Sequence, residues 1–178
     1  RSPMLQIDPI KSDKKVRQPL TAMEMKLMRN TCKTPREKAL LEVLYSTGCR
    51  VSELIRLNRN DIDYYTGIVK VLGKGSKERF CFLSANALTA LKEYLATRSD
   101  NNNALFVAEK FPHNRLGKGS IEKEISNIGI RAGIKRRVFP HLIRHTMATH
   151  MLNNGASLTE VQMILGHENP ATTQIYAK

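Results

Sequence analysis

Residues 140–178 read PHLIRHTMATHMLNNGASLTEVQMILGHENPATTQIYAK and carry the clearest structural signals of the chain. Pro140 suits the first position of a helix, and Gly155 suits the turn that follows its end. Ser157-Leu158-Thr159-Glu160 has the pattern of a capping box that starts a second helix, and Gly166 marks its end. This part of the chain is therefore expected to form two consecutive helices.

The same segment gathers side chains that suit chemistry on a phosphate group. His141, Arg144 and His145 are three and four residues apart, so a helix would place them on one face. Further along the chain are His167 and Tyr176. Arginine offers a planar fork of donors for phosphate oxygens, imidazole exchanges a proton near neutral pH, and tyrosine supplies an oxygen nucleophile.

A zinc site is the alternative for the two histidines on the first helix. His141 and His145 have the spacing of zincin ligands, but zincins need glutamate directly after the first histidine, where this chain has Leu142. Arg144 would also place a positive charge beside the metal. We therefore predict no metal site.

The chain upstream of this segment reads as helices around one hairpin. Thr21 and Glu24 form a capping box for a first helix, and Pro35 precedes a second helix that Gly48 ends. A short helix is expected over residues 52–57. Two stretches of alternating polarity, 68–72 and 79–83, predict strands joined by the lysine-bearing tip at residues 73–77.

Further elements are expected between the hairpin and Pro140. Ser84 suits the start of a helix, residues 104–107 a short strand, and Ser120 the start of a helix that ends at Gly133. The predicted fold class is mainly α with a small antiparallel β-sheet (α+β).

Composition points to a polyanionic partner. The 178 residues include 29 Lys and Arg against 16 Asp and Glu, a net charge of +13. No run of about twenty apolar residues occurs, and no helical pattern suits a membrane surface, so nucleic acid is the favoured partner. Cys32, Cys49 and Cys81 lack metal-ligand spacing and read as reduced core thiols, which together with the lack of a secretory signal predicts a cytoplasmic protein.

Three groups of residues resemble the phage-integrase family of tyrosine recombinases. His141, Arg144 and His145 precede Leu165-Gly166-His167 and Tyr176 in the order found in that family. Upstream, residues 46–54 (STGCRVSEL) are similar to its first arginine box, and residues 73–79 (GKGSKER) to its lysine-bearing hairpin. The resemblance covers nearly the whole chain and implies the recombinase catalytic-domain fold.

The resemblance also implies a reaction and the roles of its residues. Tyr176 would attack a DNA phosphodiester to form a 3′-phosphotyrosyl bond, as integrases of phages and other mobile elements do, without metal, nucleotide or other cofactor. The expected catalytic residues are Arg50, Lys74, His141, Arg144, His167 and Tyr176. Glu53 and His145 would support them. Candidate contacts to DNA phosphates are Lys77, Arg79, Lys135, Arg136 and Arg137.

By the same resemblance, residues 20–178 form the catalytic domain and residues 1–19 a basic linker. The family's N-terminal DNA-clamping domain and its C-terminal tail are expected to lie outside this chain. The partners would be double-stranded DNA and, in the full-length protein of a prokaryotic cell, further copies in a tetramer on paired sites. Two alternatives stay open: a type IB topoisomerase-like enzyme that relaxes DNA, and a catalytically silent DNA-binding regulator.

Overall fold

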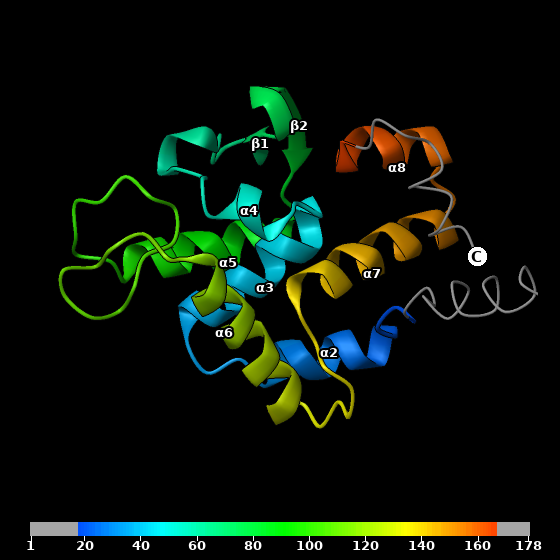
Figure 1. Cartoon of the computed structure of the whole chain (residues 1–178), viewed down its shortest axis with the longest axis horizontal. Helices are drawn as coiled ribbons and strands as arrows, with labels where there is room; N and C mark the ends of the chain where they lie inside the picture. The colour runs from blue at the N-terminus through cyan, green and yellow to red at the C-terminus, as the bar shows by residue number, and fades with distance from the viewer. Residues whose placement is uncertain (1–17, 167–178) are drawn as a thin grey trace, which may run out of the picture.

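The computed structural model describes residues 18–166, in which helices surround one β-hairpin (Figure 1). In chain order the elements are α2 (Ala22–Asn30), α3 (Pro35–Thr47), α4 (Val51–Leu54), the 3-10 helix η1 (Arg59–Asp61), β1 (Ile68–Leu72), the 3-10 helix η2 (Lys74–Ser76), β2 (Glu78–Phe82), α5 (Ala85–Ala96), α6 (Lys118–Arg131), α7 (Pro140–Asn153) and α8 (Leu158–Leu165). The predicted fold class is confirmed. None of the helices in residues 18–166 is long and apolar enough to cross a membrane.

Helix α3 lies at the centre of the core and contacts α5, α6, α7 and β2. Its residues 39–44 are all buried, so this part of the helix is enclosed by the neighbouring elements on every side. Two of its carboxylates are also enclosed: Glu42 pairs with Arg29 of α2, and Glu37 pairs with Arg131 of α6. These ion pairs attach α2 and α6 to the central helix.

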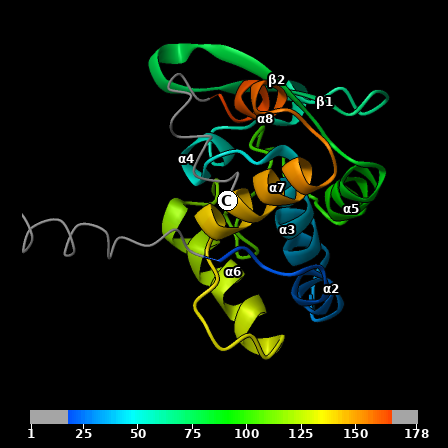
Figure 2. The same cartoon turned by 90° about the vertical axis from the view of Figure 1, so that its right-hand side faces the viewer.

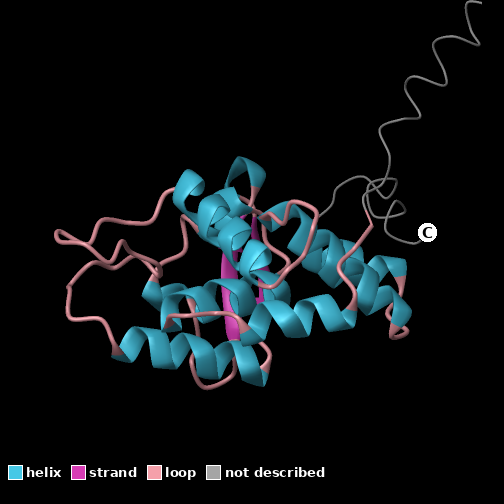
Figure 3. Ribbon diagram, turned by 90° about the horizontal axis from the view of Figure 1, so that it is seen from below, coloured by secondary structure: helices cyan, strands magenta, loops and turns pink. Residues whose placement is uncertain are grey.

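The hairpin places one apolar face against the helices. β1 and β2 pair antiparallel, with Val69 opposite Cys81 and Leu72 opposite Glu78. Val69, Val71 and Cys81 are buried, while alternate residues such as Phe80 on β2 point to the opposite, exposed side. Figure 3 shows the two strands of the hairpin among the helices.

Helix α8 lies at the same end of the molecule as the hairpin in two perpendicular views (Figures 1 and 2), and it contacts both β2 and α7. Val161 and Leu165 of α8 form a small apolar cluster with Met147 and Ala148 of α7. Because α3 supports α7, the end of α8 is positioned relative to the core by this cluster.

Most of the predicted helix caps are present, although Ser120 lies inside α6 and does not cap it. Thr21 and Ser157 form capping boxes with Glu24 and Glu160, and Gly48 ends α3 with a φ of 64°. This positive φ favours glycine, and a Cβ at Gly48 would also lie 2.6 Å from Cε of Met147, whose side chain would have to move.

Three predicted elements have different bounds in the structure, and one predicted strand is absent. α4 spans Val51–Leu54 instead of 52–57, β2 spans Glu78–Phe82 instead of 79–83, and α6 begins at Lys118 instead of near Ser120. Residues 104–107 make only isolated bridges because Arg98 binds the carbonyls of residues 104 and 105, and the Tyr94 hydroxyl accepts from the Val107 N–H. Side chains thus satisfy backbone groups that a strand would have paired.

The three cysteines are free thiols, as predicted, and two of them are buried. Burial raises the pKa of Cys49 to about 12 and the pKa of Cys81 above its usual value. Both thiols are therefore protonated at neutral pH and act as small apolar side chains.

Candidate active site

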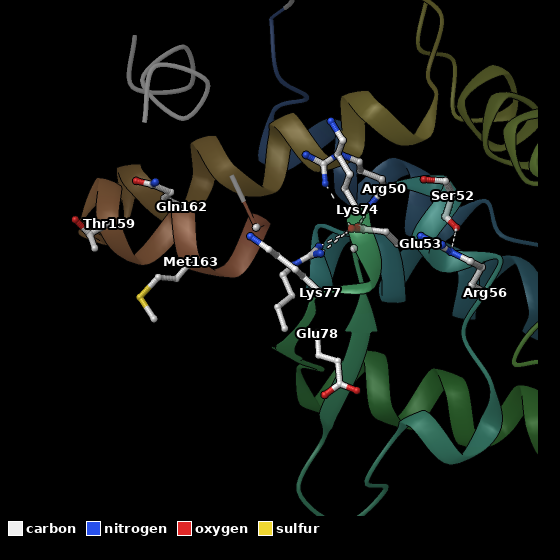
Figure 4. Close-up of a pocket in the computed structure, with 13 residues that line it drawn as sticks. Arg50, Ser52, Glu53, Arg56, Lys74, Lys77, Glu78, Thr159, Gln162 and Met163 are labelled. Atoms are coloured by element: carbon white, nitrogen blue, oxygen red, sulfur yellow. Dashed lines mark hydrogen bonds and ion pairs between the residues drawn. The ribbon is translucent and has the colours of Figure 1, made fainter. Parts of the chain in front are cut away.

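A cavity of about 740 Å³ opens between α4, the hairpin tip and α8 (Figure 4). The residues that line it are Arg50, Ser52, Glu53, Arg56, Gly73, Lys74, Lys77, Glu78, Arg79, Thr159, Gln162, Met163 and Gly166. Five of these side chains are cationic and two are carboxylates. The lining therefore attracts anions, and its shape is formed by three segments that are far apart in the sequence.

Arg50 lies between α3 and α4 and is the N-cap residue of α4. Its backbone N–H donates to Oε1 of Glu53 at 2.8 Å, which fixes the first turn of α4. Its guanidinium is 45% exposed and lies 3.4 Å from Oε2 of the same carboxylate. This contact with Glu53 leaves the Arg50 guanidinium at the cavity (Figure 4).

Glu53 makes its strongest contact with Arg79 of β2. Nη1 and Nη2 of Arg79 lie 2.6 and 2.9 Å from the two oxygens of Glu53, a bidentate pair in which the carboxylate is only 2% exposed. Burial raises the pKa of Glu53, but the hydrogen bonds from Arg79 and Arg50 and their charges outweigh it and hold the pKa below its ordinary value. Glu53 is therefore a carboxylate at neutral pH.

Lys74 lies at the tip of the hairpin, in η2. The Gly73 N–H donates to the Lys77 carbonyl at 2.8 Å, and Gly75 closes the turn with a φ of 70°. The Lys74 side chain is exposed and faces the same cavity as Arg50 (Figure 4). The structure thus brings together two of the predicted catalytic residues from separate elements.

The predicted residues of α7 are not among the described lining of this cavity. His141 is exposed in the first turn, with its ring stacked on Phe139, whereas His145 is buried. Arg144 is 2% exposed. Its guanidinium donates to the Gly48 carbonyl at the end of α3 and to the Leu165 carbonyl at the end of α8.

Of the predicted phosphate contacts, three have exposed side chains and two have partly buried ones. Lys77 is exposed at the cavity, and Lys135 and Arg137 are exposed in the loop before α7. Arg136 instead binds the carbonyls of residues 18 and 19, so it attaches the chain that precedes α2. Arg79 was also predicted to contact phosphate, but its side chain is only 12% exposed and its guanidinium pairs with Glu53.

Part of the cavity lining was not predicted. Arg56, two residues after the end of α4, donates to the Leu72 carbonyl, and Thr159, Gln162 and Met163 of α8 also line the cavity (Figure 4). The spacing of three and four residues between Thr159, Gln162 and Met163 would have placed them on one helical face. His167 and Tyr176 lie outside the described residues.

Fold and site together describe a helical domain with a cationic cavity suited to phosphate groups of a nucleic acid. The profile of the phage integrase family matches residues 10–178, and the chain belongs to this family. The recognised resemblance is thereby confirmed.

Named relatives support the same assignment. Tyrosine recombinase XerC of Histophilus somni is 42% identical over 156 residues, which are 84% of this chain and 52% of the relative. Tyrosine recombinase XerD of Oceanobacillus iheyensis is 40% identical, over 98% of this chain and 62% of the relative. The chain thus spans between about half and three fifths of the length of these relatives.

Two solved structures have the same fold. The crystal structure of XerA recombinase is 37% identical with a TM-score of 0.84, covering 92% of this chain and 59% of that one. The XerH site-specific recombinase, in a pre-cleavage complex with its difH substrate, is 26% identical with a TM-score of 0.80, covering 92% of this chain and 51% of that one.

Glu53→Gln is expected to lower the free energy of unfolding by about 3–5 kcal/mol at pH 7, because it leaves the buried Arg79 charge without its partner. Since the pKa of Glu53 is lowered by folding, its stabilising effect is complete above the ordinary value of 4.5 and is lost as the pH falls through the folded-state pKa. Urea unfolding of wild type and variant at several pH values measures both effects.

Glu78→Gln is the control, because Glu78 is exposed and its ion pair with the exposed Lys70 is long, at 3.8 Å. It should change stability by less than about 0.5 kcal/mol. A difference between wild type and Glu53→Gln that stays constant from pH 7 to pH 3 would contradict the assigned charge of Glu53.

Proposed function

We propose that this chain is the catalytic domain of a site-specific DNA recombinase that cuts and rejoins strands through a tyrosine. Tyr176 attacks the scissile phosphorus, a bond forms between its oxygen and phosphorus, and the bond to the 5′-oxygen breaks. The products are a 3′-phosphotyrosyl bond and a 5′-hydroxyl. A 5′-hydroxyl from the partner strand then reverses the step and releases the tyrosine.

The observation that carries this proposal is the convergence of Arg50 and Lys74 on one cationic cavity in a member of the phage integrase family. Negative charge builds on the non-bridging oxygens as the tyrosine attacks, and a fixed guanidinium stabilises that charge. Arg50 is anchored by Glu53 and exposed to the cavity, which suits this role. Lys74 is the proposed acid that protonates the departing 5′-oxygen.

The nucleophile needs help from its surroundings. A phenol with a pKa near 10 is ionised in only about one molecule per thousand at pH 7, a deficit of roughly 4 kcal/mol. The positive charges of the cavity favour the phenolate, and His141 is the proposed base that removes the phenolic proton. By the family resemblance, His167 and Arg144 are assigned to the phosphate oxygens and His145 supports them; Arg144 would have to turn from the Gly48 and Leu165 carbonyls to reach a phosphate.

The partner proposed for this cavity is double-stranded DNA, with Lys77, Lys135 and Arg137 as exposed phosphate contacts. No metal or other cofactor has a part in the proposed reaction. Recombination pairs two DNA sites, so the full-length protein is proposed to act as a tetramer, in the cytoplasm of a bacterial cell. A topoisomerase would need no such pairing, and a silent regulator would form no covalent intermediate.

Tyr176→Phe is expected to abolish covalent attachment to DNA, because phenylalanine has no oxygen to bond to phosphorus, while DNA affinity stays within a few-fold of wild type. A denaturing gel with labelled junction DNA measures the adduct, and a mobility shift measures affinity. Tyr65→Phe, at an exposed tyrosine that is not part of the cavity lining, is the control and should keep the adduct. An adduct with Tyr176→Phe would remove Tyr176 as nucleophile.

Wild-type protein on plasmids with one or two target sites separates the enzymatic alternatives. Exchange between paired sites supports recombination, whereas relaxation of plasmids without such sites would favour the topoisomerase.

Lys74→Ala is expected to slow cleavage by about a hundred- to ten-thousand-fold, the usual contribution of a general acid. A substrate whose bridging 5′-oxygen is replaced by sulfur should restore most of that rate, because a thiolate leaves without a proton. Arg50→Ala should gain little from the sulfur substrate, since its defect concerns the non-bridging oxygens. Rescue of both variants, or of neither, would point to Lys77 at the same hairpin tip as the acid to test next.

A further inference from the structure

We propose that Arg79 is a positioning residue of this active site, which fixes Arg50 and the end of α8 relative to each other through one guanidinium. The inference rests on the proposed function and extends it to a residue that the sequence presents as a phosphate contact. Three features of Arg79 carry it: its pairing with Glu53, its bond to α8, and its close contact with Gly166.

The first contact reaches Arg50 through Glu53. Arg79 takes both oxygens of this carboxylate, and the same oxygens accept from the backbone and side chain of Arg50. Since Glu53 is 3% exposed, its oxygens are bound by these two arginines and are largely shielded from solvent. Without Arg79 the carboxylate would turn toward Arg50 or take up a proton, and either change moves the Arg50 guanidinium.

The second contact reaches the last turn of α8. Nε of Arg79 donates to the Ile164 carbonyl at 2.8 Å, one residue before the carbonyl that Arg144 binds. The final carbonyls of a helix have no partners within it, and positive charge is favourable there. Two arginines from different elements therefore cap consecutive carbonyls at the end of α8.

The third feature is the absence of a side chain at Gly166, which ends α8 with a φ of 72°. A Cβ at this position would lie 2.9 Å from Cδ and 3.1 Å from Nε of Arg79. The backbone thus passes directly against the Arg79 side chain, and the next residue in the chain is His167. Arg79 sets the point from which the chain leaves α8 toward the remaining predicted catalytic residues.

Only arginine can make these contacts together. Its planar fork presents Nη1 and Nη2 to a carboxylate while Nε points to a third acceptor, whereas lysine offers one compact ammonium group. Arg79→Lys therefore keeps the charge but loses the geometry. A phosphate contact, in contrast, would largely tolerate lysine, because a phosphate is attracted mainly by charge.

Arg36 provides a closely matched control away from the cavity. Its guanidinium also pairs with both oxygens of a carboxylate, on Glu124 of α6, and also donates to a distant carbonyl, on Val107. The exposed fractions are similar, 15% for Arg36 and 12% for Arg79. Arg36→Lys should therefore reproduce the loss of a buried ion pair without touching the active site.

The test compares Arg79→Lys with Arg36→Lys at a temperature where melting curves show both to be folded. Single-turnover cleavage at saturating DNA is expected to fall about a hundredfold for Arg79→Lys, the effect of misplacing a catalytic group by about 1 Å, and to stay near wild type for Arg36→Lys. DNA affinity and its dependence on salt should match wild type in both variants.

Two outcomes would overturn the inference. If Arg79→Lys cleaves as fast as Arg36→Lys, Arg79 positions nothing that the reaction needs. If Arg79→Gln lowers the slope of log affinity against log salt by about one, Arg79 is a phosphate contact instead.

Hydrogen exchange gives a readout that does not depend on the reaction. Amides of the last turn of α8 and of α4 should exchange faster in Arg79→Lys and at the wild-type rate in Arg36→Lys. Wild-type protein that forms no adduct with DNA would overturn the proposed function, while the exchange data would still decide whether Arg79 holds the two elements together. Unchanged exchange in Arg79→Lys would overturn the inference in either case.

Discussion

The ion pair between Glu53 and Arg79 is the interaction on which the site depends. A carboxylate enclosed to this degree is costly unless it is paired and hydrogen-bonded, and here it meets a bidentate guanidinium and the N–H of Arg50. The pair joins β2 to α4, and the same guanidinium joins both to α8. The Arg79 side chain thus connects the three elements that form the cavity: α4, the hairpin and α8.

Arginine has two separate uses in this chain. Several arginines bind carboxylates or backbone carbonyls inside the fold, including Arg98, which is almost fully enclosed by its own loop. Others, such as Arg50 and Arg137, present their guanidinium groups to solvent. The net charge of +13 therefore indicates a polyanionic partner, but the number of arginines does not locate the surface that binds it.

Local signals in the sequence predicted most of the fold. Capping boxes, the proline at the start of α7, the glycine that ends α3 and the alternation of the strands all depend on residues within a few positions of each other. Arg50 and Lys74 were predicted differently, from short stretches of sequence that resemble motifs of the phage-integrase family. The structure then brought the two motifs to one cavity.

The binding partners of Arg79 and Arg136 could not be predicted from local patterns. Arg79 binds partners 26 and 85 residues away, and Arg136 binds a carbonyl 117 residues away, so no local pattern distinguishes them from exposed cations. For residues 104–107, the local pattern suggested a strand, and the side chains of Arg98 and Tyr94 took the backbone groups instead.

The most direct test of the central claim is a crystal structure with target DNA and orthovanadate, which mimics the five-coordinate phosphorus of the proposed reaction. The proposed geometry predicts vanadate in the cavity, with Arg50 on an equatorial oxygen, Lys74 beside one apical oxygen and Tyr176 supplying the other. The Glu53–Arg79 pair should be unchanged. Vanadate bound outside the cavity, or Glu53 separated from Arg79 when the site is occupied, would contradict it.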